Sequence, residues 1–78
     1  MCEVEIKLNT IEDVKNLVSY VTGFECDFEI ISGRFVVDAK SIMGIFSLDL
    51  SKELKLVIRS DDEFEVDRIK NKIKRFIA

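Results

Sequence analysis

Residues 40–50 read Lys-Ser-Ile-Met-Gly-Ile-Phe-Ser-Leu-Asp-Leu, and this stretch is the most informative part of the sequence about the fold. The segments before and after it alternate apolar and charged residues with a period of two, which is typical of strands that bury one face. Inside the stretch the period changes, because apolar residues fall at offsets of one, three and four behind Ser41. That spacing predicts one to two turns of helix between strands.

Four segments carry the strand pattern. Cys2 to Leu8 places its apolar residues on one face and its charged residues on the other. Phe24 to Ile30 and Phe35 to Ala39 repeat the pattern, and Ser32-Gly33 between them predicts the turn of a hairpin. Leu54 to Arg59 is the fourth predicted strand.

Two longer helices are predicted from capping residues and apolar stripes. Thr10 is placed to cap the first helix, with Asp13 as an imperfect capping-box partner and Gly23 at its end. Ser60 and Glu63 have the Ser-x-x-Glu spacing of a capping box before the last helix. The stripes that should face the core are Ile11, Val14, Leu17, Val18 and Val21 in the first helix, and Phe64 or Val66, Ile69, Ile73 and Phe76 or Ile77 in the last.

The predicted order of elements is βαββαβα, an α+β fold. One apolar face per strand and one stripe per long helix indicate an open-faced β-sandwich: a four-stranded antiparallel sheet covered on one face by three helices, with the opposite face charged and solvated. The 78 residues contain no internal repeat, no proline and no linker. We expect residues 1–78 to form a single domain.

Composition argues against several classes of function. The net charge is −3 and no basic stripe appears before the far C-terminus, so direct nucleic-acid binding is not expected. The apolar runs are too short for a membrane span and no secretory signal is seen, which favours the cytoplasm. Two cysteines without histidine cannot form a closed zinc site, so reduced thiols and no metal or cofactor are expected. No phosphate-binding loop or nucleophile elbow is present, so enzyme activity is not expected.

The order of elements, the length and the segment Lys40 to Leu48 together resemble HPr, the small phosphocarrier of the bacterial sugar phosphotransferase system. The resemblance extends from the first strand to the last helix and implies the HPr-like fold. The motif Gly-Leu-His-Ala-Arg-Pro-Ala of that family should fall near residues 9–14, where this chain reads Asn-Thr-Ile-Glu-Asp-Val. Counting back from Ser41 places Thr10 at the histidine position and Glu12 at the arginine position. The chain has no histidine, so no catalytic phosphocarrier residue is expected.

Ser41 supports two compatible interpretations. A serine here can cap the short helix by accepting a hydrogen bond from the N–H of Gly44 or Met43. In HPr proteins of low-GC Gram-positive bacteria, the matching serine is phosphorylated by a dedicated kinase, and the product acts as corepressor with a catabolite-control transcription factor. A histidine-less branch, the catabolite-repression HPr-like protein, keeps the serine, and this chain is similar to it. The resemblance therefore implies regulatory phosphorylation at Ser41.

Partner binding is the second part of that hypothesis. Ile42, Met43 and Phe46 are the candidate anchors, because a short helix cannot bury every side; Met43 and Phe46 could instead belong to the core. Expected partners are proteins, namely a serine kinase of the HPr type and a catabolite-control transcription factor. The alternative is a phosphorylation-independent structural or interaction module, a monomer or a homodimer, in which Ser41 only caps the helix.

Overall fold

The computed structural model describes residues 1–78. Its elements in chain order are β1 (Cys2–Ile6), α1 (Ile11–Thr22), β2 (Asp27–Ser32), β3 (Phe35–Asp38), α2 (Ile42–Phe46), β4 (Leu54–Arg59), α3 (Glu63–Lys72) and a 3₁₀ turn at Lys74–Phe76. The predicted βαββαβα order is confirmed, and the last helix simply tightens at its end.

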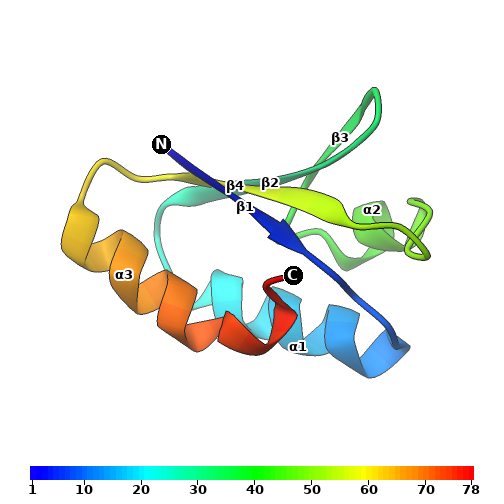
Figure 1. Ribbon diagram of the computed structural model, residues 1–78, viewed down its shortest axis with the longest axis horizontal. Coiled ribbons are helices and arrows are strands. Elements are labelled where there is room, and N and C mark those ends of the chain that lie inside the picture. Colours follow the sequence, from blue (N-terminus) through cyan, green and yellow to red (C-terminus); the bar gives the residue numbers. More distant parts are fainter.

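The four strands form one antiparallel sheet in the order β1-β4-β2-β3. β4 is central, and its Leu56 pairs with Val4 of β1 on one side and Ile30 of β2 on the other. Figure 1 shows α1 and α3 beneath one face of this sheet, with α2 at one end, where it contacts α1 and β3. The α+β open-faced sandwich expected from the sequence is therefore confirmed.

The core lies between the sheet and the helices. Every strand except β3 and every helix contributes a side chain that is 2% exposed or less, and none of the buried residues is polar or charged. Burying such a side chain stabilises the fold by about 1.5–3 kcal/mol. The cluster comprises Ile6, Leu8, Val14, Leu17, Val21, Phe28, Ile30, Ala39, Ile45, Leu54, Leu56, Ile58, Ile69, Ile73 and Phe76.

The start of α3 differs from the prediction. Its N-cap is Asp62, whose carboxylate accepts hydrogen bonds from the N–H groups of Phe64 and Glu65 at 3.0 and 3.3 Å. Ser60 instead donates its hydroxyl to Glu65 at 2.6 Å, so the Ser60–Glu63 capping box is wrong. Both residue types cap well, but a carboxylate is also favoured by the positive end of the helix dipole. Of the two residues predicted for the first position of the apolar stripe, Phe64 is 83% exposed and Val66 packs against the core.

The start of β2 also differs. The sequence pattern begins at Phe24, whereas the strand begins at Asp27, which pairs with Arg59, the last residue of β4. The neighbouring strand offers no backbone partner beyond that point, so residues 24–26 leave the ladder. Lys40 holds them instead, since its ammonium donates to the carbonyl of Phe24 at 2.8 Å.

The outer face of the sheet is mostly charged, as predicted, but it also carries three apolar residues, Ile31, Val36 and Val57. Val57 in β4 points to this face and is only 2% exposed. Its cross-strand neighbours are Glu3 and Glu29, which form ion pairs with Lys55 at 3.6 Å and Arg59 at 2.7 Å. The expectation of a fully solvated face is wrong here, because the aliphatic stems of paired charged residues cover the valine.

The two edges of the sheet differ in how far other parts of the chain cover them. Ile77 forms a bridge with Ile6 at the β1 edge, where Lys7 N–H donates to Phe76 at 2.8 Å and Ala78 N–H donates to Glu5 at 2.9 Å. The C-terminal residues therefore cover part of β1. At the other edge, β3 has a neighbouring strand only on its β2 side.

Candidate functional site

Ser41 caps α2, as predicted. Its Oγ accepts a hydrogen bond from Gly44 N–H at 3.2 Å, and its carbonyl accepts one from Ile45 N–H at 3.1 Å. The residue is exposed, and its hydroxyl donates to no protein acceptor. The hydroxyl proton is thus free to be taken by a base supplied from outside the chain.

Packing fixes α2 against the sheet. Ile45 is fully buried and is the only buried residue of this helix. A Cβ added at Gly44 would lie 3.2 Å from Ser41 Oγ and 3.4 Å from Val37 Cβ, so the glycine lets the helix approach both its cap and β3. Ser41 is therefore presented from a rigid support rather than from a loose loop.

The predicted partner anchors do not share one environment. Met43 is 75% exposed and Phe46 is 38% exposed, whereas Ile42 is half-buried and packs against the core. The apolar spacing predicts that Ile11 lies in the buried stripe of α1, which is wrong, because Ile11 is 63% exposed. Ile11 is the first residue of α1 and directly follows the cap. That position, at the very end of the helix, indicated that its side chain could lie outside the core.

Thr10 caps α1, and its Oγ accepts from Asp13 N–H at 3.0 Å. Asp13 does not complete the capping box on Thr10 but accepts from Asn9 N–H at 2.9 Å. The bond from Asp13 is the only one that the Thr10 hydroxyl makes, so no base contacts it. Glu12 lies exposed in the first turn, and no hydrogen bond joins either residue to Ser41.

A shallow hollow lies beside Thr10, lined also by Lys7, Leu50 and Ser51. Lys7 is the cation of this hollow, but its ammonium donates to the carbonyls of Leu50, at 3.4 Å, and Ser51. These bonds tie the segment after α2 to the end of β1. The cation is engaged with backbone, and the nearby hydroxyl lacks a base, so the hollow has none of the features of a phosphoryl-transfer centre.

Asp49, in the same segment, accepts two hydrogen bonds from Ser51, one from the hydroxyl at 2.6 Å and one from the N–H at 3.0 Å. These bonds favour the carboxylate and hold the pKa of Asp49 below its usual value, with the hydroxyl bond the larger cause. The resulting stabilisation is present above the unfolded-state pKa and is lost as the pH falls through the folded-state pKa.

Replacing Ser51 with Ala is expected to raise the pKa of Asp49 toward its usual value, because the stronger of the two bonds is removed. A carbon-detected NMR titration of the Asp49 carboxyl measures this directly. Ser47→Ala is the matched control, since Ser47 donates to Gly44 instead of Asp49. An unchanged Asp49 titration in Ser51→Ala contradicts the assignment.

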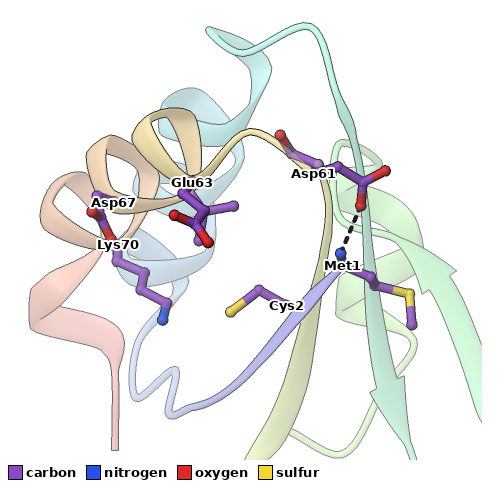
Figure 2. A pocket seen from close by; sticks show the side chains of 8 residues that line it. Met1, Cys2, Asp61, Glu63, Asp67 and Lys70 are labelled. Atoms are coloured by element: carbon purple, nitrogen blue, oxygen red, sulfur yellow. Dashed lines mark hydrogen bonds and ion pairs between the residues drawn. The ribbon is translucent and has the colours of Figure 1, made fainter.

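A second hollow, of about 400 Å³, lies between the N-terminus and the start of α3. Figure 2 shows its side chains, with the Met1 ammonium paired to Asp61 at 3.1 Å. Cys2 and Lys70 also line it, and its other carboxylates belong to the first turns of α3, where acids complement the helix dipole. The mixture of exposed charges gives no convergent site, so Ser41 remains the better candidate.

The two cysteines are free and half-buried. Burial raises the pKa of the Cys26 thiol, with a smaller contribution from Glu65.

The structure contains no group of three or more His, Cys, Asp or Glu side chains that could hold a metal ion. Every helix is too short or too polar to cross a membrane.

A sequence profile described as the PTS HPr component phosphorylation site matches residues 13–78, most of the chain. The chain belongs to the HPr family. The crystal structure of HPr-C-His from Thermoanaerobacter tengcongensis is 31% identical in sequence, with 95% of this chain and 97% of that one covered and a TM-score of 0.71. No curated protein matches the chain in sequence.

Two further solved structures share the HPr fold at lower identity. HPr from Bacillus anthracis is 20% identical, with 91% of this chain and 94% of that one covered and a TM-score of 0.66. Crh, the Bacillus subtilis catabolite repression containing protein, is 23% identical, with 96% and 88% covered and a TM-score of 0.64. The match to the HPr profile begins at residue 13, after Thr10 and Glu12, and includes Ser41.

Proposed function

We propose that this HPr-family protein is a regulatory phosphoacceptor at Ser41 and a protein-binding module, not a phosphoryl carrier. The observation that carries the proposal is the state of Ser41: an exposed hydroxyl, free to donate, at the start of a rigidly packed helix. The sequence Lys40 to Leu48, which resembles the regulatory segment of HPr, surrounds it.

The proposal excludes phosphoryl transfer through residue 10. A carrier needs a nucleophile that accepts phosphate and releases it again, which neutral imidazole does near pH 7. Thr10 has a hydroxyl engaged as a helix cap, and the nearby Glu12 would repel a phosphate where the family's arginine would bind it. A threonine ester would also be a poor donor in the next transfer step.

A phosphate on Ser41 would alter the surface more than the fold. It adds a charge of about −1.5 to −2 beside exposed apolar side chains, chiefly Met43 and Phe46. A partner can then bind through an arginine that pairs with the phosphate and through an apolar pocket for these anchors. Asp38 and Asp49 lie near in sequence and oppose the added charge slightly.

The partners in this proposal are proteins: a serine kinase of the HPr type, and a catabolite-control transcription factor that recognises the phosphorylated form. The description of Crh as a catabolite repression containing protein supports this direction. Direct contact with nucleic acid or membrane, metals and cofactors have no part in it. Residues 1–78 would act as one HPr-like domain in the cytoplasm.

The test is phosphorylation of the purified chain by HPr serine kinase with ATP and magnesium, followed by intact mass spectrometry. We expect wild type to gain the mass of one phosphoryl group and Ser41→Ala to gain none. Ser47→Ala is the matched control, because it removes an exposed hydroxyl at the other end of the same helix and should still be modified.

An authentic HPr treated in parallel shows that the kinase is active. If that protein is modified while this chain is not, the phosphoacceptor proposal fails, and the phosphorylation-independent interaction module takes its place. Modification that persists in Ser41→Ala would contradict the site rather than the class of function.

A further inference from the structure

The free edge of β3 is the most exposed apolar strand surface in the molecule. Phe35 is 64% exposed and Val36 is 56% exposed, and they point to opposite faces of an edge strand. Figure 1 shows the β2–β3 hairpin projecting beyond the helices. Natural proteins usually protect such an edge, since its unpaired backbone groups are a template for another strand.

The hydrogen-bond pattern identifies the unpaired groups. Ala39 N–H donates to the carbonyl of Phe28 at 3.1 Å, so residue 39 points its backbone toward β2. Antiparallel ladders alternate, which means that Val37 and Phe35 also face β2, whereas Val36 and Asp38 face away from it. The N–H and C=O of Val36 are therefore available at the centre of the free edge.

We propose that a second copy of this chain pairs with β3 in antiparallel orientation, about a two-fold axis at Val36. In this register Val36 lies opposite Val36 of the second copy, and the two residues exchange both backbone hydrogen bonds. Phe35 lies opposite Val37 of the second copy, and Arg34 lies opposite Asp38 of the second copy. The two sheets become one continuous sheet of two copies.

Charge complementarity selects this register. Arg34 forms no ion pair within the chain, and the Asp38 carboxylate uses only one oxygen, Oδ1, which accepts from Lys40 N–H at 2.8 Å. Asp38 shares the outer face with Val36, and Arg34 is exposed in the turn directly before β3, so the long Arg34 side chain can reach Asp38 of the second copy, and the symmetry generates two such pairs. A two-fold axis at Val37 would instead place Arg34 opposite Lys40, which is repulsive.

The size of the contact sets the expected strength. Only about five residues a side take part, so the buried area falls below the roughly 1,000 Å² of a standard stable interface. A weak, reversible, two-fold symmetric dimer is therefore expected. The proposal goes beyond the phosphoacceptor function and does not depend on phosphorylation of Ser41.

Sedimentation equilibrium of the full chain, from about 10 µM to about 1 mM, tests the proposal. Wild type is expected to shift from the mass of one copy toward that of two as concentration rises. Val36→Lys places two like charges on the axis and should weaken dimerisation by at least about tenfold. Phe64→Lys, which introduces the same charge at an even more exposed apolar residue of α3, is the matched control and should leave dimerisation unchanged.

A charge exchange tests the register. Arg34→Asp and Asp38→Arg should each weaken the dimer, and the double variant should restore it, because the pair is rebuilt with its signs reversed. A thermal melt of each variant confirms that the monomer remains folded. A chain that stays monomeric at about 1 mM overturns the proposal. So does a dimer that Val36→Lys does not weaken, such as one formed through β1, or one that the double variant fails to restore.

Discussion

Replacing Phe28 with Ala is expected to lower the free energy of unfolding by about 3–5 kcal/mol. Phe28 is 1% exposed in the middle of the core, and its ring lies 6.4 Å from that of Phe24. The Lys40 ammonium lies 5.7 Å from the same ring, so the substitution also removes a cation–π contact. The cavity would sit beneath β2, where the surrounding strands cannot collapse to fill it.

Urea unfolding followed by circular dichroism measures this loss. Small domains have a total stability of about 5–15 kcal/mol, so the variant will be only marginally folded or unfolded at 25 °C. Phe64→Ala is the matched control, because the same side chain is removed at a position that is 83% exposed, and a change within about 0.5 kcal/mol is expected. Equal losses in the two variants would contradict the assignment of the core.

Ile45→Ala is expected to cost about 2–5 kcal/mol and to loosen the site itself. Helices as short as α2 are not stable in isolation, so tertiary packing holds it in place, chiefly through Ile45, its only buried side chain. Hydrogen exchange at Gly44 and Ile45 N–H should accelerate beyond the change in global stability, since both groups bond to Ser41. Urea unfolding gives the global value for comparison.

Met43→Ala controls for this effect on the same helix. Met43 is 75% exposed, so its truncation should change the free energy of unfolding by less than about 0.5 kcal/mol. Any loss of partner binding in Met43→Ala then reports on the surface and not on folding. A large loss of stability in this variant would instead place Met43 in the core, the alternative considered from the sequence.

The fold was predictable because most of its elements carry one dominant signal. The alternation of Val4 and Ile6 with charged residues, and the caps at Thr10 and Ser41, describe local chemistry that the structure retains. Ser41 as an exposed cap could also be predicted, since a hydroxyl at the start of an apolar turn has few other uses. Its phosphorylation and its partners stay predictions.

The errors arose where two signals competed or where neighbours decided the outcome. Ser60 and Asp62 are both good caps, and sequence spacing alone does not say which one the chain uses. Phe24 belongs to the apolar alternation of β2, but β2 begins only at Asp27, opposite the last residue of β4. Val57 lies on the charged face, and its burial depends on ion pairs from adjacent strands. Such effects depend on tertiary structure, which a local pattern does not contain.

The position of β1 at the sheet edge has a consequence for biosynthesis. Its partners are β4 and the residues around Ile77, so the first strand to leave the ribosome pairs only with segments made at least 48 residues later, the separation between Ile6 and Leu54. At about 5–20 residues per second, that interval is several seconds. During it Val4 and Ile6 lack their native partners, and β1 is the segment we expect a nascent-chain chaperone to hold.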